Sequence, residues 1–224
     1  MEFHDSVLSG KSVQAYNYIC REIFSGNIRQ GDVINENEIA EACGTSRTPV
    51  RNALKQLCND GVVEIFQNKY VKVVELSEED VKHIGEARLV LEIIISKLVM
   101  FYGADADFVQ LHKIAEECKE GIQAQELYER VSSDCKFHLD LAKLSNNEIL
   151  VSFMQKILMY CGIVQADEYR EREKAERQSE IHDRIVDALL ERDKKGVNQI
   201  LVSGLMDFYH LDRELIAMIF SQKE

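Results

Sequence analysis

Two arginines, Arg47 and Arg51, lie one helical turn apart directly after Ser46, at the start of a segment that is expected to be helical. A helix that reads DNA carries hydrogen-bond donors near its N-terminus on one face, where they reach base edges or phosphates. The alternative is that both arginines are solvated surface charges. The role of this segment therefore depends on the elements around it.

A second set of residues has the types and spacing of a metal site. Asp134 and His138 are four residues apart and share one helix face. His182 lies in line with Ile185 and Leu189 on an apolar stripe. A carboxylate and two imidazoles that converge inside a helical bundle suit a divalent metal such as Zn, Ni or Mn. The alternative is that Asp134 is a charge near a helix N-terminus and that each histidine is a satisfied core residue.

The elements that would position the arginines form a helix-turn-helix. Apolar residues repeat at helical spacing over 12–25, and a second, short helix is expected over about 36–43. A third helix begins after a cap at Ser46 or Thr45 and tolerates Pro49 in its first turn. The second and third helices are therefore expected to form a helix-turn-helix.

The pattern changes to short strands after the third helix. Strands are predicted over 62–65 and 70–74, joined by a turn at 67–69 in which Asn68 tolerates a positive φ. A hairpin at this place is typical of a wing. We therefore expect a winged helix-turn-helix domain over residues 8–76.

Residues 77–224 are expected to form a second domain, an all-α helical bundle. Long segments with a period of 3.6 residues follow a cap at 77–80 and predict about six helices, so the protein as a whole is mainly α. The alternating charges of residues 169–177 are expected to form a solvated linker or a helix start without a function.

Composition favours a cytoplasmic protein. The chain has 224 residues, of which 46% are hydrophobic and 29% are charged, and its first residues do not resemble a secretory signal. The most apolar run, residues 89–102, contains Glu92 and Lys97 and is shorter than the ~20 apolar residues that span a bilayer. We expect no membrane association.

Cysteine spacing indicates the redox state of the thiols, and charge distribution indicates which partners the first domain can bind. The six cysteines contain no Cys-x-x-Cys pair, which favours reduced thiols in the core. The net charge is −12, but residues 1–76 carry eight Lys/Arg against ten Asp/Glu, so most of the acidity lies in the second domain. A locally basic face on the first domain remains compatible with DNA.

Several segments together resemble GntR-type bacterial transcription regulators, in the FadR-like branch with a helical C-terminal (FCD) domain of the shorter, six-helix type. The matching segments are 23–31, 38–40, 46–57, 60–63 and 88–92. The resemblance covers nearly the whole chain and is strongest over residues 12–66. It implies that Arg47 and Arg51 contact DNA, with Ser46 at the cap and Thr48 as a phosphate partner.

The sequence departs from this family at two DNA-binding positions. Asn37 stands where a DNA-contacting arginine is often found, so contact with the DNA backbone there is expected to be weaker. Tyr70 stands at the usual glycine position of the wing, so any contact from the wing must come from Asn68 or Lys69.

The resemblance also implies a metal site. Members of the metal-binding type use an Asp-x-x-x-His pair, matched by Asp134 and His138, and two later histidines, of which the first matches His182. The second is expected about 22 residues further on, where the chain has Gly204, and His210 lies about 240° around the helix from that position. The site therefore looks one ligand short, although three ligands still hold a metal whose open positions are filled by water or by a ligand carboxylate.

Arg88 is expected to bind the effector. A guanidinium that faces a bundle cavity clamps a carboxylate in bidentate fashion, and the effectors of the family are often small organic, sugar or amino acids. The alternative is an ion pair with Glu92 within one helix, which contributes ~0.2–0.5 kcal/mol when exposed.

The sequence therefore predicts a homodimeric transcription regulator, expected to be a repressor. Each winged helix-turn-helix would read half of a palindromic double-stranded DNA operator, and a small-molecule effector would control binding. One alternative is an enzyme with a catalytic metal, but Glu180 lies about 200° around the helix from His182 and so is poorly placed as a general base. The other alternative is a module in which the winged helix or the bundle binds another protein.

Overall fold

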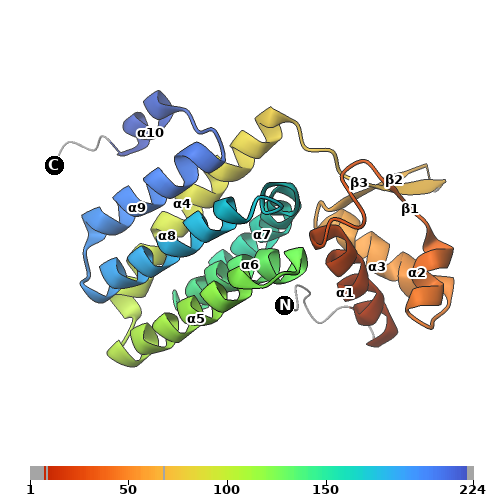
Figure 1. Ribbon diagram of the computed structural model, residues 1–224, viewed down its shortest axis with the longest axis horizontal. Coiled ribbons are helices and arrows are strands. Elements are labelled where there is room, and N and C mark those ends of the chain that lie inside the picture. Colours follow the sequence, from red (N-terminus) through yellow and green to blue (C-terminus); the bar gives the residue numbers. More distant parts are fainter. Residues whose placement is uncertain (1–7, 9, 68, 221–224) are drawn as a thin grey trace.

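The computed structural model describes residues 8, 10–67 and 69–220 and consists of two parts (Figure 1). The first part contains a small sheet and three helices at one end of the molecule. The second contains the remaining helices, which run roughly along the long axis of the molecule. Mainly α architecture with an N-terminal winged helix-turn-helix confirms the predicted fold class.

The first part follows the predicted order of elements. The helices are α1 (Gly10–Phe24), α2 (Glu36–Ala42) and α3 (Arg47–Asn59), and the strands are β1 (Val33–Ile34), β2 (Val63–Phe66) and β3 (Tyr70–Val73). The side chain of Asn35 accepts a hydrogen bond from the backbone N–H of Asn37 and so caps α2. Ser46 is the N-cap residue of α3, but its side chain makes no capping hydrogen bond.

The wing is a three-stranded antiparallel sheet in the order β1-β3-β2. Val63 pairs with Val73, and Ile34 pairs with Val71. Strand β1 was not predicted from the sequence, because two residues are too few to show the alternation of apolar and polar residues that marks a strand.

The second part contains seven helices in the described residues, one more than the sequence predicted. They are α4 (Glu78–Tyr102), α5 (Asp105–Gln123), α6 (Leu127–Lys143), α7 (Glu148–Glu168), α8 (Arg172–Leu190), α9 (Lys194–Phe208) and α10 (Arg213–Phe220). The first six close into a ring in which α9, α4, α7, α6, α5 and α8 each pack against the next, and α8 returns to α9. The short α10, which lies outside this ring, is the helix that the sequence missed.

Helix α7 is long and apolar enough to cross a membrane by length and composition, and it is the one helix of the described residues that passes this test. Over half of its apolar window is buried inside the protein, where α7 packs between α4 and α6. Its apolar character is therefore that of a core helix.

Helix α1 joins the two parts by packing on α6 and α7. The ring of Phe24 is fully buried and lies over Gly162, where a Cβ atom would come within 2.5 Å of it. Tyr160 of α7 approaches Gly61, and Gln30 donates a hydrogen bond of 2.8 Å to Asp167. The winged part thus rests on the same helix that lines the centre of the bundle.

Candidate functional site

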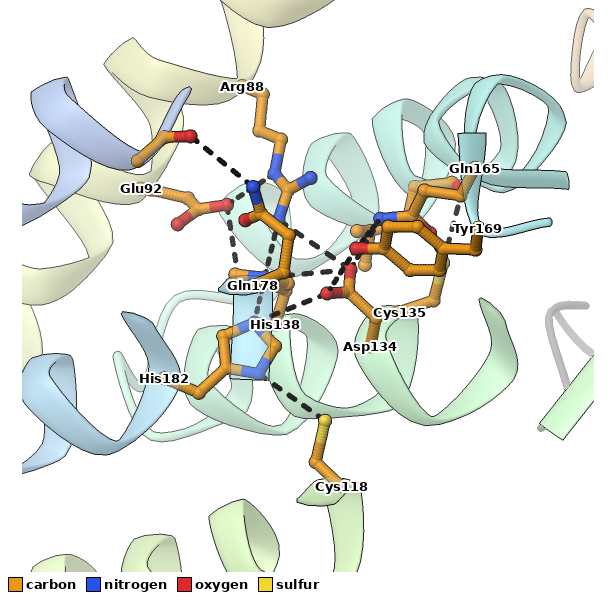
Figure 2. Close-up of polar contacts among 12 residues, drawn as sticks. Arg88, Glu92, Cys118, Asp134, Cys135, His138, Gln165, Tyr169, Gln178 and His182 are labelled. Atoms are coloured by element: carbon orange, nitrogen blue, oxygen red, sulfur yellow. Dashed lines mark hydrogen bonds and ion pairs between the residues drawn. The ribbon is translucent and has the colours of Figure 1, made fainter. Parts of the chain in front are cut away.

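The predicted metal-site residues meet at the centre of the helical ring (Figure 2). Asp134 and His138 come from α6 and His182 comes from α8, and all three are buried. The Nε2 atoms of the two histidines lie 3.0 Å apart. The Asp134 carboxylate lies 3.3 Å from Nε2 of His182 and 3.8 Å from Nε2 of His138.

These separations suit a shared cation. Metal–ligand bonds of ~2.0–2.2 Å to imidazole and carboxylate place neighbouring ligand atoms about 2.8–3.6 Å apart for octahedral or tetrahedral geometry. Two of the three ligand–ligand separations fall in this range, and all three ligand atoms lie within 4.8 Å of one another. Asp134, His138 and His182 could therefore hold a divalent metal.

The Asp134 carboxylate is fixed by Gln165 of α7 and by Tyr169, the residue that follows this helix as its C-cap. Gln165 donates from Nε2 at 2.5 Å, and the hydroxyl of Tyr169 donates at 2.9 Å. Burial raises the pKa of Asp134, but the hydrogen bond from His182 and the nearby charge of Arg88 outweigh it and hold the pKa well below its usual range. The carboxylate is therefore ionised and oriented, as expected of a metal ligand with supporting hydrogen bonds.

The second histidine is held by packing and by a thiol. The ring of Phe137 stacks on that of His182 with a centroid separation of 4.1 Å and an interplanar angle of 19°. The Nδ1 atom of His182 lies 3.3 Å from the sulfur of Cys118. Its Nε2 atom is thereby directed toward Asp134 and His138, as Figure 2 shows.

Arg88 reaches the same centre from α4 and is 1% exposed. Its Nε donates to Glu92 at 2.7 Å, its Nη1 donates to the hydroxyl of Tyr209 at 2.9 Å, and its Nη2 donates to Nε2 of His138. Nη2 also lies 3.8 Å from Asp134. The ion pair with Glu92 is present, but it is buried inside the candidate site rather than exposed on a helix surface.

The protonation states around Arg88 follow from burial and charge. Burial and the Arg88 charge lower the pKa of His138, despite the nearby carboxylates of Glu92 and Asp134. A neutral imidazole is the form that accepts a hydrogen bond from a guanidinium. Burial raises the pKa of Glu92, but His138 and Arg88 outweigh it and lower the pKa to about 2.

Three buried polar atoms near this centre have no hydrogen-bond partner among the described residues. They are Oε2 of Glu92, Oγ of Ser96 one turn further along α4, and Nδ1 of His138, which lies 3.1 Å from Glu92 without hydrogen-bond geometry. Leaving such a group unpaired costs ~1–3 kcal/mol, and more when the group is charged. The site therefore offers polar groups that a bound molecule could satisfy.

Gly204 lies on α9 against α8, and the space beside it is filled. A Cβ atom at this position would come within 2.8 Å of Ile181, and the Gly204 carbonyl accepts a hydrogen bond of 3.4 Å from Gln178. A histidine would not fit here without a shift of Ile181. His210 is exposed beyond the end of α9, so it does not supply the fourth ligand either.

Sequence reasoning missed several residues of this centre. Gln165 and Tyr169 share one face of α7 at a spacing of four residues, which was the available signal, but nothing in the sequence shows that this face meets Asp134. Tyr169 was assigned to a solvated charge run without function, and this was wrong because its side chain is fully buried. Cys118 and Tyr209 come from other helices and carry no signal of their own.

The predicted DNA-binding residues lie together on the opposite part of the molecule. Arg47, Thr48 and Arg51 are exposed in the first two turns of α3, directly after the exposed cap Ser46. Together with residues of α2 and the wing, the two arginines line a groove of about 860 Å³. Asn37, Lys69 and Tyr70 are among the other lining residues.

The two arginines contact helix α2. Arg51 Nε lies 2.9 Å from a carboxylate oxygen of Glu36, and Arg47 Nε donates to the side-chain oxygen of Asn37. The side chain of Asn37 therefore bonds to α3, the recognition helix that carries Arg47 and Arg51, a contact that its family position did not indicate.

The wing presents fewer candidate contacts. Lys69 is exposed in the turn between β2 and β3, whereas Asn68 lies outside the described residues. Gln67 has a positive φ of 45°. Tyr70 stacks on Phe66 with a centroid separation of 4.8 Å and so forms part of the hairpin surface.

Comparison with known proteins finds two families that match this chain. The gntR family of bacterial regulatory proteins matches residues 11–73, and the FCD domain matches residues 83–205. The uncharacterized HTH-type transcriptional regulator YdhC of Bacillus subtilis is 28% identical over 91% of this chain and 92% of its own length. The gluconate operon transcriptional repressor of Bacillus licheniformis is 26% identical over 87% of this chain and 84% of its own length.

Solved structures share the same fold. The structure described as E. coli McbR/YncC has a TM-score of 0.78 at 18% identity and covers 96% of this chain and 100% of its own. A putative transcriptional regulator GntR from Rhodococcus sp. RHA1 has a TM-score of 0.76 at 21% identity, with the same coverage. At these identities the similarity shows the fold alone.

Proposed function

Since this chain belongs to the bacterial regulatory proteins of the gntR family and carries an FCD domain, we propose that it is a homodimeric repressor controlled by a small carboxylate bound at the buried centre of its helical ring. The family and its relatives are transcriptional regulators and not enzymes, as the sequence predicted. The observation that carries the proposal is the buried Arg88 guanidinium beside Asp134, His138 and His182.

Arg88 supplies the recognition of a carboxylate. A guanidinium binds a carboxylate through two parallel N–H bonds, and burial strengthens such charge-assisted bonds. Nε2 of His138 has one lone pair, which accepts from Arg88 in this structure. When that lone pair binds a metal instead, Nη2 of Arg88 needs another acceptor, and the carboxylate of a ligand supplies one.

Asp134, His138 and His182 would hold a divalent metal such as Zn, Ni or Mn. Such an ion would act as a Lewis acid that anchors an oxygen of the ligand. Three protein ligands leave coordination positions open, because Gly204 has no side chain that could act as a fourth ligand. The unpaired atoms of Glu92 and Ser96 would then receive hydrogen bonds from other polar groups of the ligand.

Repression and the ligand class are supported by a relative. The gluconate operon transcriptional repressor of Bacillus licheniformis is, by its name, a repressor, and gluconate is a carboxylate. A DNA-binding regulator works where the chromosome is, so we place this chain in the cytoplasm.

On the DNA, Arg47 and Arg51 would contact base edges, with Ser46, Thr48 and Lys69 available for the backbone. A dimer would place two such surfaces on a palindromic operator. An exposed apolar surface for the second copy lies on the ring: Val90, Ile94 and Phe101 on α4, and Ile149 and Phe153 on α7. Since α4 and α7 pack side by side, these residues could form one continuous interface.

A titration of DNA binding tests the proposal. Fluorescence anisotropy would measure the affinity of the full-length protein for the DNA upstream of its own gene while small carboxylates, including gluconate, are added with Zn, Ni or Mn. We expect at least one carboxylate to weaken DNA binding by tenfold or more in the wild type. The Arg88→Gln variant should keep its DNA affinity and lose the response, whereas Arg184→Gln, an exposed control on α8, should respond normally. An equal response in Arg88→Gln would contradict the proposed site.

A further inference from the structure

Helix α2 holds each arginine of the recognition helix by the same atom. Nε of Arg51 bonds to Glu36, and Nε of Arg47 bonds to Asn37, so consecutive residues of α2 engage both side chains. Among the described residues, no hydrogen bond or ion pair involves Nη1 or Nη2 of either arginine. Both arginines remain exposed on the groove between α2, α3 and the wing.

The choice of atom decides which edge of the guanidinium faces outward. A guanidinium has five N–H donors in one plane, and two of its edges present a pair of roughly parallel donors. The edge that includes Nε is blocked when Nε is already bonded to α2. The Nη1 and Nη2 edge stays free, and its two donors match the O6 and N7 acceptors of guanine in the major groove.

We infer that Glu36 and Asn37 are positioning residues that set Arg47 and Arg51 for bidentate contact with guanine. This inference rests on the proposed DNA binding and deepens it, because it names a base and reassigns Asn37 from the DNA backbone to Arg47. Four residues of α-helix rise about 6 Å, and base pairs are about 3.4 Å apart. Each half-site should therefore carry guanines one or two base pairs apart.

The negative charge of Glu36 allows a positioning role to be distinguished from electrostatic attraction to DNA. The carboxylate of Glu36 lies in the same groove as the arginines, so it repels phosphates and weakens binding to DNA of any sequence. Its benefit is confined to sequences in which Arg51 finds its acceptors. Loss of Glu36 should therefore lower the preference for the specific site over other DNA sequences without lowering the affinity for non-specific DNA. Removal of a residue with a purely structural role would lower both affinities.

The experiment begins with selection of binding sites by the full-length protein from a pool of random duplexes. We expect guanines in each half-site. In the selected duplex, replacing one such guanine by 7-deazaguanine removes N7 and should weaken binding about fivefold or more, since a full bidentate contact discriminates by roughly 5- to 100-fold. Inosine keeps O6 and N7, so the same position should tolerate it.

Variants then test the two positioning residues. Glu36→Ala and Asn37→Ala should each lower the affinity ratio between the selected duplex and its guanine-to-adenine version at least threefold. Non-specific binding should be unchanged or, for Glu36→Ala, tighter. Asn37→Asp keeps an acceptor for Arg47 and should restore the ratio, and Glu41→Ala, an exposed control on the same helix, should leave it unchanged.

Other outcomes overturn the inference. It fails if the selected sites lack guanine, if 7-deazaguanine is tolerated, or if both alanine variants keep the wild-type ratio. It also fails if the variants lose specific and non-specific binding equally, or if Asn37→Asp behaves like Asn37→Ala with the same melting temperature. A wild-type protein that selects no sequence would instead overturn the proposed operator binding itself.

Discussion

At the residue scale, the buried carboxylate of Asp134 is constrained from several sides. It contacts both histidines of the cluster and accepts hydrogen bonds from Gln165 and Tyr169 on another helix. Hydrogen bonds of this kind orient ligating carboxylates in metal sites, and their loss typically costs 10- to 100-fold in metal affinity. Tyr169→Phe should therefore weaken metal binding while leaving the fold intact.

The buried charges predict a pH dependence of stability in the metal-free protein. The folded state lowers the pKa of His138 below 6.5 and that of Glu92 from 4.5 to about 2. The unfolded chain therefore binds more protons as the pH falls, and the free energy of unfolding should decrease below about pH 6.5 and further between about pH 4.5 and 2.

Urea unfolding at several pH values, with a chelator present, measures this dependence. Glu92→Gln keeps an acceptor for Arg88 but cannot titrate, so its stability should change less than that of the wild type between pH 4.5 and 2. Identical slopes for the two proteins would show that Glu92 is not held ionised by its neighbours.

The DNA surface predicts a contrast between two kinds of contact. Arg51→Ala should weaken binding to upstream DNA by roughly 5- to 100-fold and relax the preference at one base position. Lys69→Ala should weaken binding to all sequences alike and reduce the slope of log affinity against log salt by about one. Anisotropy titrations at several salt concentrations measure both, and an unchanged affinity in Arg51→Ala would exclude it from the interface.

Sequence reasoning succeeded for residues that share one helix and failed for contacts between helices. The spacing of Asp134 and His138 placed both on one face of α6, as the structure shows. Neither the contact of Asp134 with Tyr169 nor that of Asn37 with Arg47 could be predicted, because each depends on how two helices pack. Period and spacing identify a face but not its partner.

At the element scale, α7 connects the two parts of the molecule. Gln165 on one face of α7 and Tyr169 at its C-cap hold Asp134, and another face carries Gly162, on which Phe24 of α1 packs. A shift of α7 on ligand binding would therefore act directly on α1, because close-packed elements do not move independently. Ligands shift such an equilibrium only by their different affinity for the two states.

The contact between α7 and α1 predicts a stability effect. In Gly162→Ala the added Cβ meets the ring of Phe24, and overpacking of this kind costs ~1–3 kcal/mol, of which better helix propensity recovers at most ~1 kcal/mol. Urea unfolding should show a net decrease in the free energy of unfolding of Gly162→Ala relative to the wild type. Gly10→Ala, where nothing lies within 4 Å, is the matched control and should stay within ~0.5 kcal/mol of the wild type. A stable Gly162→Ala protein would mean that α1 is not tightly packed on α7.

The elements that the sequence failed to predict are the short ones. Strand β1 has two residues and exists through its pairing with β3. Helix α10 follows a break at which His210 adopts a positive φ of 53°. No proline or glycine at this break marks it in the sequence. Long amphipathic helices with clear caps were predictable, because their period is a local property.

At the scale of the whole molecule, we expect two copies of the chain to form a symmetric dimer. The apolar residues on α4 and α7 are exposed in the single chain, with Ile94 43% and Phe153 56% exposed. Ile94→Glu would bury a charge in the proposed interface and should convert the protein to a monomer, as light scattering after size exclusion would show. It should also weaken binding to a palindromic operator far more than binding to a half-site. A wild-type protein that is already monomeric would contradict this interface.

The metal content of the purified protein tests most directly whether the buried cluster is a ligand-binding centre built on a metal. After dialysis against Zn, Ni or Mn and removal of excess ion, elemental analysis should find about one metal ion per chain in the wild type and less than a tenth of that in His138→Ala. Absence of stoichiometric metal from the wild type with all three ions, or equal metal in both proteins, would contradict the claim and leave Asp134, His138 and His182 as lining residues only.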